Sequence, residues 1–96
     1  MLVWFIYDIS STKTRNKISK FVLKKGLYRV QKSVFLGNID KSIMDELIIS
    51  SEEKINKKTD SLYVFPMCEK DFKSVVLKGQ VFDKKMVNDE IKAFFV

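Results

Sequence analysis

The stretch that decides the fold is residues 27–36, Leu27-Tyr28-Arg29-Val30-Gln31-Lys32-Ser33-Val34-Phe35-Leu36. Strand geometry places successive side chains on opposite sides. One side then carries Tyr28, Val30, Lys32 and Val34, and the other carries Arg29, Gln31, Ser33 and Phe35. Ten residues with this pattern form either one bent strand or two short strands hinged near Lys32, and Gly37-Asn38 ends them.

On the N-terminal side of this stretch, the sequence predicts one strand and one helix. Residues 2–9 are nearly all apolar, as in a strand that is covered on both faces. Residues 10–12, Ser-Ser-Thr, then offer N-cap side chains for a helix that runs to about Lys25. Gly26 stands where a glycine commonly ends a helix.

On the C-terminal side, a second helix is expected from about residue 40 to residue 54, with acidic residues on its outer face. A polar connector leads to a strand at residues 61–67, which Pro66 ends or bends. Residues 69–73 could make one helical turn, and residues 74–81 another short strand.

The resulting order of strand, helix, strand pair, helix and strand is that of a ferredoxin-like βαββαβ sandwich of the α+β class. The 96 residues form a single domain, with a core of about residues 1–80 and a C-terminal extension at 81–96. Within the extension, residues 84–92 allow a helix and residues 93–96 favour an extra strand.

One face of such a sheet is left largely apolar, because both helices cover the other face. A chain of this size buries only roughly 60–65% of its unfolded surface, so pairing with a second subunit is a natural route to stability. Residues 74–96 could cover the apolar face in cis or from that second subunit. We therefore expect a homodimer.

The positive charge is concentrated in one segment. The net charge is +6, and the eight basic side chains between Ile9 and Ile39 have no acidic neighbour in that segment. Four of them fall at helical spacing on one stripe: Lys13, Lys17, Lys20 and Lys24. This placement favours a face that binds a polyanion over a merely solvated lysine-rich helix, which is the alternative.

Composition excludes several kinds of chemistry. The chain has no histidine, which excludes a Ser-His-Asp or Cys-His triad, and its single cysteine, Cys68, excludes an intrachain disulfide and a thiolate zinc cage. The longest apolar run, residues 1–7, is too short to span a membrane and has no basic start like that of a signal peptide. We expect a cytoplasmic protein without membrane contact.

Asp8 is the first candidate for chemistry, because it closes the apolar strand. Alternation puts it on the face of Trp4 and Ile6, at the carboxyl end of the strand. A carboxylate there could bind Mg²⁺, which takes one or two carboxylates and keeps several waters. Alternatively, Asp8 caps the turn at residues 10–12 by accepting backbone N–H groups. A two-fold axis beside it would bring a second copy to a metal site.

Arg15 and Arg29 are the only arginines, and the guanidinium fork suits phosphate better than a lysine does. A surface ion pair is the alternative for each, although this segment contains no acid. Aromatic residues such as Phe35 interleave with the basic ones, as in some single-strand binders, but aromatics on strands are more often core. Ser33 has no base partner in the sequence and is interpreted as a hydrogen-bonding residue of the sheet.

Three segments together resemble a known family. They are Tyr7-Asp8-Ile9 after the apolar strand, Arg15-Asn16-Lys17 in the first helix, and the stretch from Gly26 to Gly37; residues 60–67 add to the likeness. They are similar to the CRISPR-associated adaptation endonucleases, the small subunit usually numbered second among the Cas proteins. The likeness covers roughly residues 1–82.

The resemblance implies a ferredoxin-like homodimer that binds nucleic acid and partners the CRISPR integrase. It implies Mg²⁺ as the cofactor and Asp8 as the catalytic, metal-binding acid, with its second copy facing it across the dimer axis. It further implies nucleic-acid-binding positions near the site, at Arg15, Lys17, Arg29, Ser33 and Phe35.

This chain departs from the family pattern in two places. Many members have further acids in the loop after the first strand, where this chain has residues 10–12, Ser-Ser-Thr, and often a second arginine beside Arg15, where it has Thr14. Both differences bear on catalytic strength more than on the fold.

The function predicted from these observations is a CRISPR adaptation protein with Mg²⁺-dependent endonuclease activity on single-stranded RNA, double-stranded DNA or both. Three alternatives remain open at this point. They are a nonenzymatic dimeric DNA scaffold of the integrase complex, a toxin-like ribonuclease of related fold, and a ferredoxin-like regulatory domain that binds a small molecule.

Overall fold

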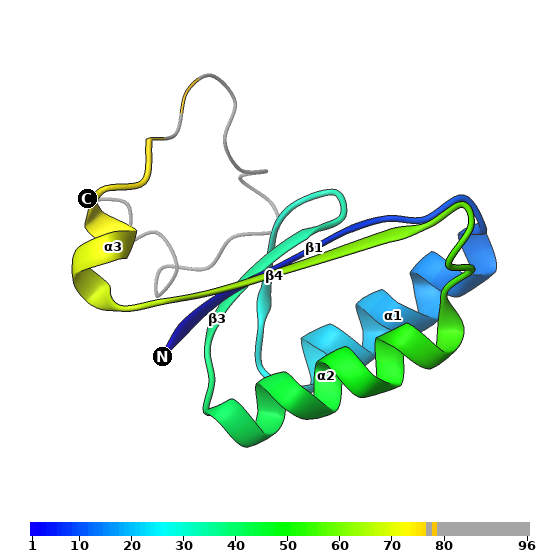
Figure 1. Ribbon diagram of the computed structural model, residues 1–96, viewed down its shortest axis with the longest axis horizontal. Helices are drawn as coiled ribbons and strands as arrows, with labels where there is room; N and C mark the ends of the chain where they lie inside the picture. Colours follow the sequence, from blue (N-terminus) through cyan, green and yellow to red (C-terminus); the bar gives the residue numbers. More distant parts are fainter. Residues whose placement is uncertain (77, 79–96) are drawn as a thin grey trace.

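The computed structural model describes residues 1–76 and 78. Its elements follow the predicted order (Figure 1): β1 (Leu2–Asp8), α1 (Thr12–Lys24), β2 (Tyr28–Gln31), β3 (Val34–Asn38), α2 (Lys41–Lys54), β4 (Ser61–Met67) and α3 (Glu69–Lys73). The decisive stretch is a strand pair, because residues 32 and 33 form a turn between β2 and β3.

The four strands form one sheet in the order β2-β3-β1-β4, and every neighbouring pair is antiparallel. The first strand therefore lies in the interior, between β3 and β4, as its apolar sequence predicts. This is the α+β, ferredoxin-like architecture expected from the sequence, and two helices pack against one side of the sheet (Figure 1).

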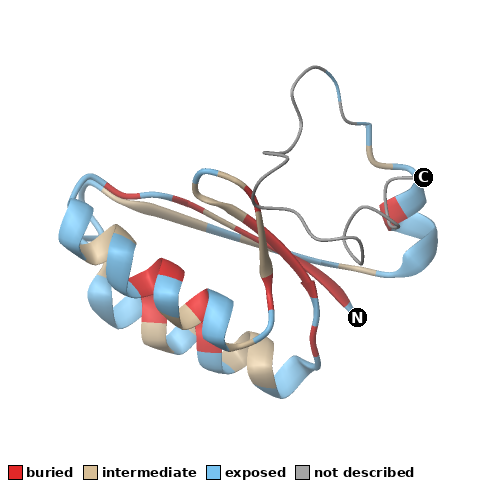
Figure 2. Cartoon of the chain, turned by 180° about the vertical axis from the view of Figure 1, so that it is seen from behind, coloured by how far each residue is buried: buried red, intermediate tan, exposed pale blue. Residues whose placement is uncertain are grey.

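The main core lies between the sheet and the helices α1 and α2. Val3, Phe5 and Tyr7 of β1 pack in one cluster with Ile18 of α1 and Leu47 of α2, and all five are buried. Figure 2 shows buried segments, in red, both on the sheet and on the two helices. This alternation leaves Leu2, Trp4, Ile6 and Asp8 for the opposite side of the sheet, which we call the open face.

Short polar signals fix the ends of the helices. The Ser11 side chain caps α1 by accepting from the Thr14 backbone N–H, and Asp40 caps α2 in the same way through Ile43. After α1, Gly26 takes a φ of 100°, a conformation that favours glycine. Gly37 is required for a different reason, because a Cβ there would lie 2.9 Å from Leu27 Cα.

The open face carries a second, smaller apolar cluster. Phe72 of α3 stacks on Trp4 with ring centroids 6.0 Å apart, and Leu2, Val30 and Leu36 are buried around them. Beside this cluster, an open hollow of about 400 Å³ is lined mainly by apolar side chains from the sheet and by Val75. The neighbouring β4 leaves large apolar side chains half exposed, Tyr63 at 49% and Phe65 at 46%.

Pro66 lies inside β4, opposite Val3, and does not end the strand. The strand is at the edge of the sheet, where proline is tolerated. The strand expected at 74–81 is wrong for residues 74–76, which follow α3 as a turn and irregular chain. The remainder of that strand and the whole extension at 81–96 lie outside the described residues.

None of the helices in the described range is long and apolar enough to cross a membrane.

Candidate metal and nucleic-acid site

Asp8 is the last residue of β1 and lies opposite Ser61 of β4. It is exposed, and it lies on the open face with Trp4 and Ile6, as alternation predicts. Among the described residues its carboxylate has no hydrogen-bond or ion-pair partner. The alternative role as a cap is therefore wrong, since Ser11 caps the helix instead.

The loop after Asp8 is tied to the start of β4 by Asp60. The Asp60 carboxylate accepts from the backbone N–H of Ser10 at 3.1 Å and from the Ser10 hydroxyl at 3.0 Å. It also accepts from the backbone N–H of Asn56 at 2.9 Å and from the Thr59 hydroxyl at 3.1 Å. These donors, first of all the N–H groups of Asn56 and Ser10, hold the pKa of the Asp60 carboxyl below its ordinary value.

Arg15 holds the same loop from the helix side. Its Nη1 donates to the carbonyl oxygens of Ile9 at 2.8 Å and Ser10 at 3.3 Å, and its Nη2 donates to the Thr12 hydroxyl at 2.7 Å. The side chain is half-buried and forms hydrogen bonds within the loop, not the surface ion pair considered as its alternative. A guanidinium has five N–H donors, so the remaining ones are left for phosphate.

Arg29 and Phe35 form a cross-strand pair on the helix side of the sheet. The Arg29 guanidinium carbon lies 5.1 Å from the centroid of the Phe35 ring, and its Nε is buried without a hydrogen-bond acceptor. Phe35 itself is fully buried, with its ring 5.8 Å from that of Tyr7. The expectation that Phe35 contacts nucleic acid is therefore wrong. Its buried ring instead packs against the Arg29 guanidinium.

Ser33 lies in the turn between β2 and β3 with a φ of 68°, which is unusual for a residue other than glycine. Its carbonyl oxygen accepts from the backbone N–H of Tyr7 at 3.1 Å. This bond places the turn beside the carboxyl end of β1, next to Asp8. Ser33 thus acts here through its backbone.

The four lysines of the α1 stripe, Lys13, Lys17, Lys20 and Lys24, are all exposed. They belong to the helical layer, whereas Asp8 lies on the open face. The sheet therefore separates Lys17 from the carboxylate of the same chain. The structure brings Asp8, Ser33 and the Arg15-bound loop together at one end of β1, and it places Lys17 apart from them.

A single chain supplies one carboxylate to a metal at this position. No group of three or more metal-ligating acidic or cysteine side chains occurs in residues 1–76 and 78. The free, exposed carboxylate of Asp8 fits Mg²⁺, which binds through one or two carboxylates and keeps several waters. A second copy of the chain would add a second Asp8 carboxylate to the donor set.

Sequence reasoning missed Asp60. Its main partner, Ser10, is 50 residues away along the chain, so no local pattern links the two. The available signal was indirect: an aspartate directly before the strand expected at residues 61–67.

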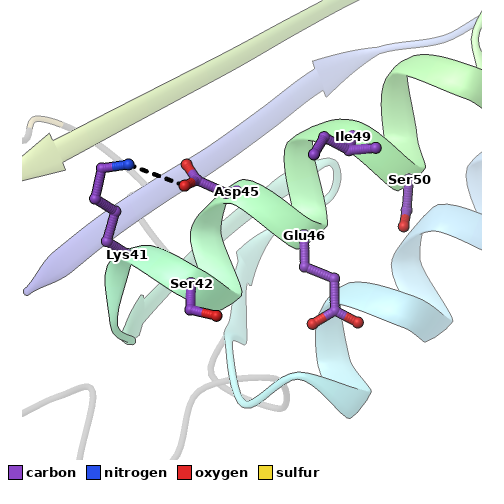
Figure 3. Close-up of a pocket in the computed structure, with 6 residues that line it drawn as sticks. All are labelled: Lys41, Ser42, Asp45, Glu46, Ile49 and Ser50. Carbon is purple, nitrogen blue, oxygen red and sulfur yellow. Dashed lines mark hydrogen bonds and ion pairs between the residues drawn. The ribbon is translucent and has the colours of Figure 1, made fainter.

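A second hollow, of about 600 Å³, runs along the outer surface of α2 (Figure 3). Its lining contains the Lys41–Asp45 ion pair, 3.0 Å between Nζ and Oδ2, and the exposed side chain of Ile49. None of the residues predicted from the sequence to form the site lies there.

Known proteins resemble this chain over most of its length. A protein from Korarchaeum cryptofilum named CRISPR-associated endoribonuclease Cas2 is 31% identical over 74 residues, which are 74% of this chain and 76% of that protein. A protein from Archaeoglobus fulgidus named CRISPR-associated endoribonuclease Cas2 1 is 30% identical over 70 residues, 73% of this chain and 74% of that protein.

Solved structures share the fold. Streptococcus pyogenes Cas2 superposes with a TM-score of 0.69 and 24% identity, over 82% of this chain and 100% of that chain. A hypothetical protein from Thermus thermophilus gives 0.64 and 27% identity, over 70% of this chain and 80% of that chain. The sequence profile of CRISPR associated protein Cas2 matches residues 1–75. The chain belongs to the Cas2 family of CRISPR-associated proteins.

Proposed function

We propose that this protein is a Mg²⁺-dependent endonuclease of CRISPR adaptation, which cleaves phosphodiester bonds of single-stranded RNA, double-stranded DNA or both. The observation that carries the proposal is Asp8, an exposed carboxylate that has no partner among the described residues, at the end of a buried strand. Relatives named endoribonucleases support a nuclease, and the family favours a CRISPR role over a toxin-like ribonuclease or a small-molecule regulator.

The working unit is a homodimer. The open face holds Asp8 together with the half-exposed side chains of Tyr63 and Phe65 and an apolar hollow, and a second copy would cover these surfaces. If the two-fold axis of such packing passes beside the end of β1, it brings two Asp8 carboxylates toward one another.

Mg²⁺, when bound, supplies charge stabilisation at the scissile phosphate and activates water for attack. Asp8 of each copy would hold the ion, and the loop bonds of Arg15 would keep the backbone beside Asp8 fixed. Arg29 and Lys17 would bind phosphate groups away from the scissile bond. No histidine exists to act as a base, so proton transfer depends on the carboxylates and on solvent.

A nonenzymatic scaffold for the CRISPR integrase is the second candidate, and one observation favours it. The exposed lysine stripe of α1 lies on the other side of the sheet from Asp8, so nucleic acid can be held there without reaching the carboxylate of the same chain. In this role the protein is a dimeric support on which DNA and the integrase assemble.

The variant Asp8→Ala tests the first candidate against the second. We expect cleavage of labelled RNA or DNA to fall at least about 100-fold, because removal of one ligand from each chain leaves the ion without protein anchors. Binding of the same nucleic acid in chelator should change less than twofold. Cleavage would be measured with Mg²⁺ and with chelator, next to Asp45→Ala, which removes a partly exposed carboxylate of α2 that is ion-paired with Lys41.

Wild-type cleavage that needs both Mg²⁺ and Asp8, with Asp45→Ala fully active, would support the nuclease. Tight binding without cleavage by any of the proteins would overturn it and leave the scaffold. Cleavage that survives Asp8→Ala would show that the acid is not at the reacting centre.

A further inference from the structure

The three-residue loop that follows Asp8 is held from two opposite sides. Arg15 donates hydrogen bonds to the carbonyl oxygens of Ile9 and Ser10. The Asp60 carboxylate accepts hydrogen bonds from the backbone N–H and the hydroxyl of Ser10. Ser10 is therefore bonded through its N–H, its carbonyl and its side chain.

Asp60 is the member of this arrangement that joins distant parts of the chain. One carboxylate oxygen, Oδ1, receives both Ser10 donors and the Thr59 hydroxyl, and the other, Oδ2, receives the N–H of Asn56. The neighbouring Ser61 is the register partner of Asp8 in β4. Asp60 thus fastens the Asp8 loop at the point where β1 and β4 begin to pair.

We propose that Asp60 is a positioning residue for Asp8. The inference rests on the proposed nuclease function. The Asp8 carboxylate has no bond of its own among the described residues, so its position depends on the backbone on either side. Strand β1 fixes the backbone before it, and Ser10, held by Asp60 and Arg15, fixes the backbone after it.

The expected size of the effect follows from the chemistry of supporting residues. Removal of a residue that orients a metal ligand without touching the metal typically lowers metal affinity or activity about 10–100-fold. Displacement of a reacting group by about 1 Å can cost as much. Asp60 contacts Ser10 and not Asp8 itself, so we expect its removal to lower activity by a factor at the lower end of this range.

A purely structural role is the competing explanation, because Asp60 also ties together the connector between α2 and β4. The positioning role depends on Oδ1, which accepts from Ser10, whereas the bond within the connector to Asn56 uses Oδ2, so variants that change one oxygen can distinguish the two roles. Asp60→Asn keeps Oδ1 as an acceptor for Ser10 and Thr59, but places an amide group opposite the N–H of Asn56. Asp60→Ala removes both connections, and Ser10→Ala removes only one donor to Oδ1.

The experiment compares these three variants with Asp8→Ala and with Asp45→Ala as the control, at a temperature where all are folded by circular dichroism. Three quantities would be measured: kcat and KM for cleavage, hydrogen exchange of the Ser10 amide, and broadening of the amide signals of residues 8–11 by Mn²⁺. We expect Asp60→Ala to lower kcat about 10-fold with KM nearly unchanged, to expose the Ser10 amide and to weaken Mn²⁺ binding. Ser10→Ala should lower kcat about twofold.

Asp60→Asn decides between the two roles. Under the proposal it restores the protection of Ser10 and most of kcat, although it loses the bond to Asn56. Equal losses for the asparagine and alanine variants, in step with lower thermal stability, would overturn the positioning role. Full activity of Asp60→Ala together with an inactive Asp8→Ala would also overturn the positioning role, but it would leave the proposed nuclease function standing. An active Asp8→Ala would overturn both proposals.

Discussion

Ser33 is the one described non-glycine residue with a positive φ, 68°, and it closes the turn that makes two strands from one stretch of sequence. A left-handed backbone costs an ordinary residue about 1–2 kcal/mol, and glycine escapes that cost but loses more entropy on folding. We expect Ser33→Gly to raise the free energy of unfolding by about 0.5 kcal/mol and Ser33→Val to lower it by about 1–2 kcal/mol. Urea denaturation measures both.

The neighbouring Lys32 is the matched control, because its φ is not positive. Lys32→Gly gains no relief from strain and loses backbone entropy, so it should destabilise the protein by about 0.5–1 kcal/mol. A stabilised Lys32→Gly together with a destabilised Ser33→Gly would contradict the turn geometry.

Single residues also show the limit of reasoning from sequence. The face of Asp8 was predicted correctly, since alternation within one strand is a local property. Phe35 was assigned to binding through the family resemblance, whereas the sequence pattern alone favoured a core position for an aromatic residue on a strand, and the core position is the one observed. The bonds of Asp60 join residues that only the pairing of β4 with β1 brings together.

The lysine stripe is the feature of α1 that we propose binds nucleic acid. Each lysine that neutralises a phosphate releases counterions, and its loss lowers the slope of log K against log salt by about 0.9 on B-form DNA. We expect Lys17→Gln to lower the slope by about this amount, and Lys17→Gln with Lys24→Gln by about twice as much, for any DNA sequence. Titrations at several salt concentrations would measure the slope.

Lys41→Gln on α2 is the control for the stripe, because the Lys41 side chain is bonded to Asp45 at 3.0 Å. It should leave the slope unchanged. If Lys41→Gln lowers the salt slope as much as Lys17→Gln does, DNA is attracted by the net charge of the protein, and α1 is not the binding face.

The helices were predictable because their end signals are local. Ser11, Asp40 and Gly26 each act within a few residues, and α1 and α2 begin and end within a residue or two of the expected positions. The strand pair was left open because the alternation runs through Lys32 and Ser33 without interruption. What resolves it is the antiparallel pairing of β3 with β1, a contact between distant segments.

At the scale of the whole molecule, the exposed apolar side chains of β4 predict the dimer. Phe65 is 46% exposed on the open face, so Phe65→Lys should alter the stability of the single subunit by no more than about 1 kcal/mol. In the dimer the same lysine would be buried without a partner. Sedimentation equilibrium should then show monomers, and cleavage should be lost together with the dimer.

Ile49→Lys is the control on the other side of the molecule. Ile49 is 59% exposed on α2, in the helical layer, and its replacement should leave a dimer that still cleaves. A dimer that withstands Phe65→Lys and separates with Ile49→Lys would place the contact on the helices and remove the argument that brings two Asp8 residues together.

The sheet that separates Asp8 from the lysines of α1 also has a consequence for the evolution of the sequence. Mutations on one side of a sheet seldom disturb side chains on the other, since the two sides share backbone but few contacts. Under the proposed function, natural selection could therefore alter the side that cleaves and the side that binds nucleic acid in separate steps. In that case a descendant that lost Asp8 would still bind nucleic acid through α1, and a gene under selection only for binding would drift toward variants with no acid at the end of β1.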